Sequence, residues 1–282
     1  MDIELKDIEF SYTGKGAPAL QGVTARIAPG IHLLAGENGA GKTTLLHIIA
    51  GLRRPTRGLC LIDGADPASD RPGEMGQLFL LEENQEFPGK TIMDFAAQHS
   101  RFYPKFSQTD FLYNLGEFGL TGNEPMKKLS VGMKKKAQLS YILALGTPLL
   151  LLDEPTNALD IEGRETLRRL IGMQIQPDRT LLISTHSIEQ FESLFDGCIV
   201  LERSKLVLTA TEEEVSSRLA FRNLRESDAE ALYTEPQING TLAITPLHRD
   251  DEPTRTDWRM LYSALHSPAQ ARILESITTK RP

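Results

Sequence analysis

Hydrophobic and polar positions alternate at the start of the chain, and this period of two predicts a strand. The apolar positions of the segment are Ile3, Leu5, Ile8 and Phe10. The charged neighbours between them favour an edge strand of an antiparallel sheet. A second strand is expected over residues 20–27, before the turn at Pro29-Gly30. The chain is therefore expected to begin with an antiparallel β piece.

Short, continuous apolar runs further along the chain are typical of strands that are buried on both faces of a parallel sheet. These runs lie at residues 31–35, 75–81, 149–152, 180–184, 198–201 and 206–208. Helical segments are expected between several of the runs, at 42–52, 162–175 and 187–195. Strands that alternate with helices predict an α/β fold with a mainly parallel sheet.

A helical insertion is expected at about residues 91–146, because aromatic residues and leucines recur there at helical spacing. The two clearest series are Phe95-His99-Phe102 and Phe111-Leu115-Phe118. After about residue 212 the pattern weakens, with a strand expected at 241–245 and a short amphipathic helix at 257–265. We therefore expect a main domain over residues 1–215 and a C-terminal extension over residues 216–282.

Composition indicates an ordinary globular protein and argues against a nucleic-acid partner. The 282 residues are 40% hydrophobic and 24% charged, with a net charge of -7, whereas proteins that bind nucleic acids through phosphate neutralisation are usually basic. Cys60 and Cys198 lie in apolar runs and are expected to be reduced, buried thiols. No leader and no apolar run of the roughly 20 residues needed to span a bilayer is visible. We expect a soluble protein that depends on other chains for any action at a membrane.

A glycine-rich loop follows the predicted strand at 31–35 and matches the phosphate-binding pattern G-x-x-x-x-G-K-[ST]. Its residues are Gly36, Glu37, Asn38, Gly39, Ala40, Gly41, Lys42 and Thr43, with Thr44 next. The glycines let backbone N–H groups surround phosphates at the start of the next helix. Lys42 is expected to contact the β- and γ-phosphates, and the Thr43 hydroxyl a magnesium ion. Such a pattern arises by chance in roughly one of 100 chains of this length, and its strand–loop–helix context makes chance rarer.

Two acids follow the apolar run at 149–152, namely Asp153 and Glu154. After such a strand in a phosphate-loop protein, the Asp is expected to hold Mg²⁺. Glu154 is then expected to orient the attacking water and to accept its proton. The simpler interpretation is a pair of strand-end acids that face solvent or cap a helix. The phosphate loop favours the catalytic interpretation.

Three further motifs complete a resemblance to the ABC ATPases. Leu129-Ser-Val-Gly-Met133 resembles their signature, Asn157-Ala-Leu-Asp160 their D-loop, and Ser184-Thr-His186 their switch histidine. Lys42 precedes Asp153 by 111 positions, and the helical insertion fills this gap. The resemblance covers about residues 1–210. Within the family, the sequence is most similar to bacterial single-domain ATPase subunits of the exporter-like drug and peptide resistance group.

The resemblance implies a phosphate-loop NTPase core that works as a head-to-tail dimer, with two ATP molecules between the subunits. Ser130 and Gly132 of one subunit would contact the γ-phosphate held by the other, and Asp160 would lie near the dimer centre. His186 would contact the γ-phosphate, and Tyr12 would stack on adenine; a core or surface histidine and a plain strand-end aromatic are the simpler interpretations. The implied cofactors are ATP and Mg²⁺.

The sequence departs from the family pattern at several positions. Val131 and Met133 replace a glycine and a glutamine of the signature. The glutamine that usually joins the metal shell aligns best with Glu82, and Gln85 is the alternative. The three lysines 134–136 open the helix after the signature. They are expected to form a solvated face or to offset the charge of the triphosphate.

The expected function is an ATP-hydrolysing subunit that drives transport, with export as the expected direction. Its expected partners are polytopic membrane permease subunits and a second identical or related ATPase subunit, which would place it on the cytoplasmic face of the cell membrane. The alternative is a non-transport ABC ATPase with a soluble partner. A catalytically inactive regulatory module is a third class, and the presence of Lys42, Asp153, Glu154 and His186 argues against it.

Overall fold

The computed structural model describes residues 1–12, 17–69, 76–174, 176–224, 230–238, 240–248 and 250–278. Its centre is a six-stranded sheet in the order β5-β6-β7-β3-β8-β9. The strands are β3 (Gly30–Ala35), β5 (Leu78–Leu81), β6 (Leu149–Asp153), β7 (Thr180–Ser184), β8 (Gly197–Glu202) and β9 (Lys205–Thr211). All neighbouring pairs are parallel except β8 with β9. The predicted α/β fold with a mainly parallel sheet is confirmed.

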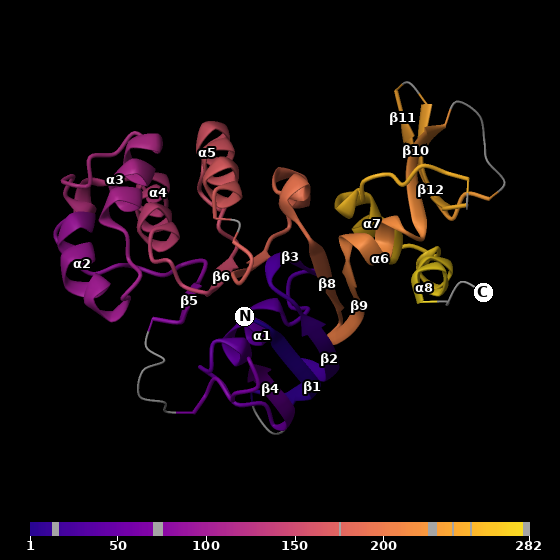
Figure 1. Cartoon of the computed structure of the whole chain (residues 1–282), viewed down its shortest axis with the longest axis horizontal. Helices are drawn as coiled ribbons and strands as arrows, with labels where there is room; N and C mark the ends of the chain where they lie inside the picture. The colour runs from indigo at the N-terminus through magenta and orange to yellow at the C-terminus, as the bar shows by residue number, and fades with distance from the viewer. Residues whose placement is uncertain are drawn as a thin grey trace.

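The two faces of this sheet are buried by different parts of the chain, which explains why its strands are apolar throughout. Leu150 and Leu152 of β6 pack in one core with α5 (Ile161–Gly172) and the helical insertion. Leu149 and Leu151 face the other core, with α1 (Lys42–Ile49) and the N-terminal strands. Figure 1 shows α5 on one side of the sheet and α1 on the other. Successive residues of a strand point to opposite faces, so only a continuous apolar run can fill both cores.

The N-terminal antiparallel sheet contains β1 (Ile3–Phe10), β2 (Leu20–Ile27) and β4 (Arg57–Ile62) in the order β2-β1-β4. The expectation that the first strand lies at an edge is wrong, since β1 pairs with both neighbours. The polar side chains of β1 point away from the core, and its inner residues pack against α1. An alternating pattern shows that one face of a strand is solvated, but not how many strands flank it.

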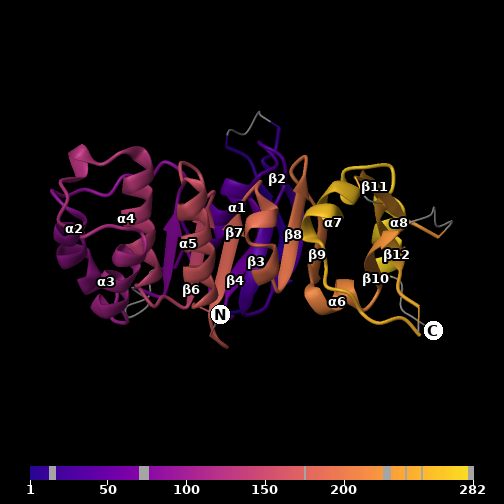
Figure 2. The same ribbon diagram turned by 90° about the horizontal axis from the view of Figure 1, so that it is seen from above.

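The helical insertion contains α2 (Ile92–His99), α3 (Gln108–Glu117) and α4 (Val131–Leu143), with short 3-10 turns at Ser100–Phe102 and Met126–Lys128. Side-chain caps begin each of the three helices, from Thr91, Ser107 and Ser130. Phe95, His99 and Phe111 of the predicted series pack around Tyr141 of α4. Figure 2 shows these helices at one end of the molecule. The predicted helical content of this region is confirmed.

Some predicted elements differ in length or type from the structure. The helix expected over 42–52 ends at Ile49, and Gly51 then takes a positive φ of 72°. The helical segment expected over 187–195 consists of two 3-10 turns, at Ile188–Gln190 and Glu192–Leu194. Residues 75 and 175, which begin one expected strand and end one expected helix, lie outside the described residues.

The C-terminal extension forms a second antiparallel sheet, which the sequence indicated only at one strand. After α6 (Glu212–Ser216), the extension contains β10 (Leu219–Leu224), β11 (Tyr233–Gln237), β12 (Gly240–Pro246), α7 (Trp258–Leu265) and α8 (Gln270–Thr278). The strand order is β10-β12-β11. Trp258 and Leu261 of α7 belong to the same apolar core as Leu208 of β9. The extension therefore packs on the antiparallel end of the central sheet.

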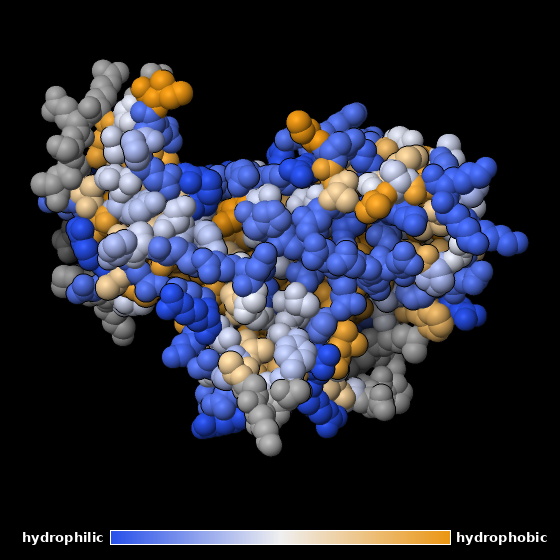
Figure 3. Space-filling model, turned by 180° about the vertical axis from the view of Figure 1, so that it is seen from behind, coloured by the Kyte–Doolittle hydropathy of each residue, from blue (hydrophilic) through white to orange (hydrophobic). Residues whose placement is uncertain are grey.

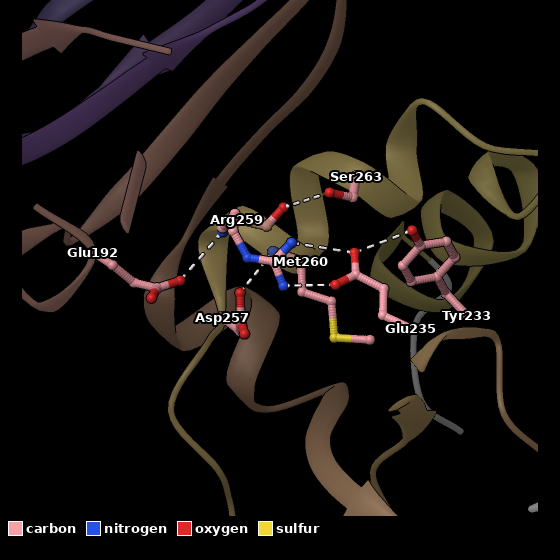
Figure 4. A network of polar contacts seen from close by, with 7 residues as sticks. All are labelled: Glu192, Tyr233, Glu235, Asp257, Arg259, Met260 and Ser263. Carbon is pink, nitrogen blue, oxygen red and sulfur yellow. Dashed lines mark hydrogen bonds and ion pairs between the residues drawn. The ribbon is translucent and has the colours of Figure 1, made fainter. Parts of the chain in front are cut away.

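A polar network joins α7 to this second sheet and to the main domain (Figure 4). Arg259 forms an ion pair with Glu235 of β11, with Nη2 and Oε2 2.7 Å apart. The backbone N–H of Arg259 donates to Glu192 Oε1 at 3.2 Å, and Asp257 caps α7 by accepting from the N–H of Met260. Burial raises the pKa of Glu192, and the nearby Asp257 carboxyl adds to this shift. One turn of α7 thus contacts both neighbouring parts of the chain.

One face of the molecule is mostly hydrophilic (Figure 3), and, as expected from the sequence, the two cysteines are buried. Hydrophilic residues cover most of the face in Figure 3, with small hydrophobic patches between them. Among the described helices, none is long and apolar enough to cross a bilayer. Cys60 and Cys198 are buried free thiols, and burial raises the pKa of each to about 12. Such thiols stay protonated and pack as small apolar groups.

Candidate nucleotide-binding site

The glycine-rich loop connects β3 to α1 and passes close to neighbouring backbone. At Gly36, an added Cβ would lie 2.5 Å from the carbonyl oxygen of Leu201 in β8. At Gly41, it would lie 2.5 Å from the carbonyl oxygen of Ala19, and the φ of 106° there also disfavours other residues. Glycine at these two positions is therefore required by both space and conformation.

Lys42 and Thr43 begin α1, and both side chains are held by polar atoms. The Lys42 ammonium donates to the carbonyl oxygens of Gly36 at 2.7 Å and Glu37 at 3.3 Å. The Thr43 hydroxyl donates to Asp153 Oδ2 at 2.7 Å. The loop thus curves around a buried cation at a helix N-terminus, which is a suitable environment for phosphate oxygens. The hydroxyl–carboxylate pair offers hard oxygen ligands of the kind that Mg²⁺ prefers.

Glu154 lies just past β6 in a strained backbone conformation, with a φ of 46°. Its N–H donates to the carbonyl oxygen of Ser184 in β7 at 2.9 Å, which holds the turn. Its carboxylate oxygen Oε2 lies 3.0 Å from His186 Nδ1, but the two atoms are not aligned as a hydrogen bond, so the buried Oε2 has no such partner among the described residues. A buried acceptor in this state is suited to a water molecule or a substrate atom.

A cavity of about 260 Å³ joins these groups. Its lining comes from Tyr12, Ala19, Asn38, Gly39, Gly41, Lys42, Thr43, Thr44, Glu83, Asp153 and Glu154. Glu83 was missed from the sequence, where Glu82 was aligned with the metal shell and Gln85 was the alternative. In the structure Glu82 Oε1 instead lies 2.6 Å from His47 Nε2 of α1, and Gln85 Oε1 accepts from the N–H of Glu82 at 3.4 Å. The only sequence signal for Glu83 was that it is the second of two adjacent acids after a strand.

Tyr12 lies at the rim of the cavity and is 55% exposed. Its hydroxyl lies 2.8 Å from the hydroxyl of Thr44, within hydrogen-bond distance. The Arg53 guanidinium lies over the Tyr12 ring, 4.8 Å from the centroid, and Phe10 contacts the ring edge-on. The ring is therefore fixed in place beside the phosphate loop and can present a face to a flat ligand.

The signature residues lie outside this cavity. Ser130 caps α4 by accepting from the N–H of Met133 at 3.2 Å. Gly132 lies against the backbone of Ala158, where an added Cβ would be 2.7 Å from the carbonyl oxygen. Val131 is 72% exposed. One chain thus brings together the phosphate loop, the two acids, His186 and Tyr12, but holds the signature on a separate surface.

Asp160 and two of the three lysines make polar contacts with neighbouring parts of the chain. Asp160 caps α5 through the N–H of Gly163 at 2.9 Å. Lys136 Nζ lies 2.9 Å from Asp160 Oδ1, and this contact lowers the pKa of the carboxyl. Lys135 is buried, and its Nζ donates to the carbonyl oxygen of Glu83 at 3.1 Å. The expectation of a solvated face is therefore wrong for Lys135, because consecutive helical residues point in different directions.

The fold and this site define a phosphate-loop nucleotide-binding protein. Comparison with known proteins gives the family, since the model of the family described as ABC transporter matches residues 20–157. The nickel import ATP-binding protein NikO of Rhodobacter capsulatus is 31% identical over 237 residues, covering 77% of this chain and 92% of that protein. The chain belongs to the ABC transporter ATP-binding proteins.

Other relatives show how broad the family is. The energy-coupling factor transporter ATP-binding protein EcfA2 of Methanospirillum hungatei is 32% identical over 227 residues, covering 76% of this chain and 56% of that protein. The daunorubicin resistance ATP-binding protein DrrA3 of Streptomyces coeruleorubidus is 28% identical, covering 81% of this chain and 73% of that protein. A solved structure of the ATP-binding subunit of an ABC transporter superposes with a TM-score of 0.67 at 26% identity, covering 76% of this chain and 92% of that chain. These relatives include a nickel import protein and a daunorubicin resistance protein, so family membership leaves the transport direction open.

Proposed function

We propose that the chain is the ATP-hydrolysing subunit of a membrane transporter and that it works as a head-to-tail dimer. The observation that carries this proposal is the position of Glu154. Its buried carboxylate oxygen Oε2 lies 3.0 Å from His186 Nδ1 and makes no hydrogen bond with the described residues, and Glu154 lines the same cavity as Lys42 and Thr43. Glu154 would thus act as a general base next to the phosphate loop, as hydrolysis of a phosphoanhydride requires.

The loop and its neighbours would bind the nucleotide. Backbone N–H groups of residues 36–44 and the Lys42 ammonium would contact phosphate oxygens at the N-terminus of α1. Tyr12 would stack on the adenine with the ring face that Arg53 leaves open. These donors fit a triphosphate. The cavity combines the buried Lys42 ammonium with a helix N-terminus, and the glycines let the loop backbone pass close to its neighbours.

A magnesium ion would be held by few protein atoms. Thr43 Oγ1 and Asp153 Oδ2, which lie 2.7 Å apart, are the ligands that the geometry favours. Among the described residues, no cluster of three or more acidic, histidine or cysteine side chains is placed to hold a metal, so nucleotide oxygens and water would complete the shell. Glu83, which lines the cavity, is better placed for that shell than Glu82, which contacts His47.

Glu154 and His186 would carry out the chemical step. The Glu154 carboxylate would orient a water molecule and receive its proton as the water oxygen bonds to the γ-phosphorus. The bond from the γ-phosphorus to the β–γ bridging oxygen would break, and ADP would leave with that oxygen. His186 would contact the γ-phosphate. Its ring, with Nδ1 3.0 Å from Oε2, would also hold the Glu154 side chain in place. Bound ATP supplies the phosphoryl group, and Mg²⁺ offsets the charge that develops on it.

The dimer is proposed because part of the site lies on the surface of one chain. Ser130 is exposed at the start of α4, and its helix N-terminus is a suitable anion site for the nucleotide of a second subunit. The neighbouring apolar residues Val131 and Ile161 are 72% and 82% exposed. Asp160 lies next to Ile161 at the start of α5. A second copy would cover this apolar and polar surface and complete both sites.

The partners that cross the membrane would be separate polytopic permease subunits. This would place the protein on the cytoplasmic face of a cell membrane. We propose export as the direction of transport, on the basis of the likeness to the resistance protein. We also propose that residues 1–215 form the ATPase domain and residues 216–282 an extension of it.

An affinity pull-down tests the transporter assignment. The tagged full-length chain is purified from detergent-solubilised native membranes, and the recovered proteins are identified by mass spectrometry. A stoichiometric polytopic membrane protein is expected, and its identity would point to a substrate class. Recovery of soluble partners alone would contradict the transporter assignment and favour a non-transport ABC ATPase.

A further inference from the structure

The loop that follows β5 is attached to α4 by two buried side chains. Lys135 Nζ donates to the carbonyl oxygen of Glu83 at 3.1 Å, and Gln138 Nε2 donates to the carbonyl oxygen of Gln85 at 2.7 Å. Residues three apart lie on the same face of a helix, so one face of α4 holds two successive points of the loop. We call residues 82–87 the clamped loop.

Of the two side chains, Lys135 is the more unusual, because it is a buried charged group. It is only 5% exposed, and a buried ammonium is costly unless nearby groups compensate its charge. Burial lowers its pKa, while the negative charges of Glu83, Asp153 and Glu154 counteract this shift. The balancing charges are therefore carboxylates of the nucleotide site itself, although Lys135 does not line the cavity.

The clamped loop also contacts the segment that contains Glu154. Glu83 Oε1 accepts from Asn157 Nδ2 at 2.6 Å, and the backbone N–H of Asn157 donates to the carbonyl oxygen of Glu154 at 3.2 Å. A continuous series of contacts thus leads from Lys135 through Glu83 and Asn157 to Glu154. Glu83 is held at both ends, its carbonyl by α4 and its carboxylate by Asn157.

We propose that Lys135 is a positioning residue for ATP hydrolysis, because it fixes the clamped loop and thereby the turn that holds Glu154. This inference rests on the proposed function. Since α4 begins directly after Ser130, a displacement of the signature also moves Lys135. Engagement of the signature by a second subunit would in this way be transmitted to the general base of the same chain.

The first test compares three variants of the full-length chain in steady-state ATPase assays. Lys135→Met removes the ammonium and keeps the length of the side chain, whereas Lys135→Arg keeps a positive donor. Lys128→Met is the matched control, because Lys128 is exposed in the turn before the signature. Lys135→Met is expected to lower kcat about 10- to 100-fold and to change the KM for ATP less than about 3-fold, as loss of alignment does.

Lys135→Arg is expected to show at most about half of the decrease in log kcat that Lys135→Met shows. Lys128→Met is expected to have the kcat of the wild type. Equal kcat values for Lys135→Met and the wild type would overturn the inference. A fall in ATP binding together with kcat would also overturn it, since a positioning role leaves the phosphate loop intact. A wild-type chain without ATPase activity would instead refute the proposed function, which keeps the two failures distinct.

A double-mutant cycle tests whether Lys135 acts through Glu83. If it does, the effects of Lys135→Met and Glu83→Ala on kcat are not additive, and the double variant resembles the more impaired single variant. Additive losses would overturn the proposed route.

Amide hydrogen exchange of the nucleotide-free protein is a measurement that does not depend on ATPase activity. It can also be made if Lys135→Met is less stable than the wild type. Faster exchange at residues 82–87 is expected in Lys135→Met and not in Lys128→Met. Unchanged exchange there would contradict the clamp.

Discussion

Replacement of Glu154 by glutamine gives the most direct test of the site. Glutamine has nearly the same size as glutamate, and the backbone hydrogen bond from residue 154 to Ser184 does not depend on the side chain. The substitution therefore removes a proton acceptor and leaves the strained turn in place. Lys42 and the phosphate loop are unchanged, so ATP affinity is expected to stay within about 3-fold of the wild type, as for a group that acts mainly in the transition state.

The size of the effect follows from the role assigned to Glu154. Loss of a positioned general base slows a reaction about 10²- to 10⁴-fold, which corresponds to about 2.7–5.5 kcal/mol of activation free energy. The buried position of Glu154 favours the upper part of this range, because little bulk water reaches Oε2 to replace the lost base. Phosphate release under saturating Mg²⁺-ATP measures kcat, and equilibrium binding of labelled ATP measures affinity.

A matched control uses Glu165→Gln, since Glu165 is an exposed residue of α5 away from the cavity. It is expected to hydrolyse ATP at the wild-type rate. The Glu154→Gln chain should also retain ATP long enough to move from monomer to dimer on gel filtration. A wild-type rate for Glu154→Gln would refute its assignment as the base, and a persistent monomer with saturating ATP would refute the dimer of isolated subunits.

Three further substitutions test the loop and the C-terminal extension. Gly41→Ala places a Cβ 2.5 Å from the Ala19 carbonyl oxygen and should abolish measurable ATP binding, with a loss of about 1–3 kcal/mol of stability; unchanged binding in a filter assay would contradict this. Trp258→Ala should lower the free energy of unfolding by about 3–5 kcal/mol in denaturant titrations followed by circular dichroism, and an unchanged value would show that α7 is not part of the main core. Burial raises the pKa of Glu192, with Asp257 adding to it, so its ionised form costs stability as the pH rises above the ordinary glutamate pKa of about 4.3. Glu192→Gln should therefore raise Tm at neutral pH, with a gain that disappears in more acidic buffer, and an equal gain at all pH values would contradict the reasoning.

The central sheet could be predicted because its physical requirement is local and strict. A strand covered on both faces must be apolar at every position, and Leu149 to Leu152 meet this requirement without any knowledge of their neighbours. The phosphate loop is equally local, since its glycines and Lys42 act within one turn of chain. The expectation for Asp153 depended on its place at the end of a buried strand and on the presence of the phosphate loop, and the structure brings it to Thr43.

The second antiparallel sheet was largely missed because its strands lack such a pattern. β11 reads Tyr-Thr-Glu-Pro-Gln and is partly or fully exposed throughout, so neither period nor composition marks it. It is a strand because β12 offers a paired edge and because Arg259 holds Glu235. β12 follows β11 almost directly in the chain, but Arg259 lies 24 positions from Glu235, and this contact with α7 leaves no trace in the pattern of β11.

The lysines 134–136 show why the contacts around α4 could not be predicted from the sequence. Successive residues of an α-helix differ by about 100° in direction, so three adjacent lysines at the start of α4 meet three environments. Lys134 lines the open groove beside the clamped loop, Lys135 is buried against Glu83, and Lys136 is paired with Asp160. A run of like charges on a helix therefore cannot be assigned one role. Which lysine acts on Glu154 is decided by the elements that surround α4, and the clamped loop is the element that singles out Lys135.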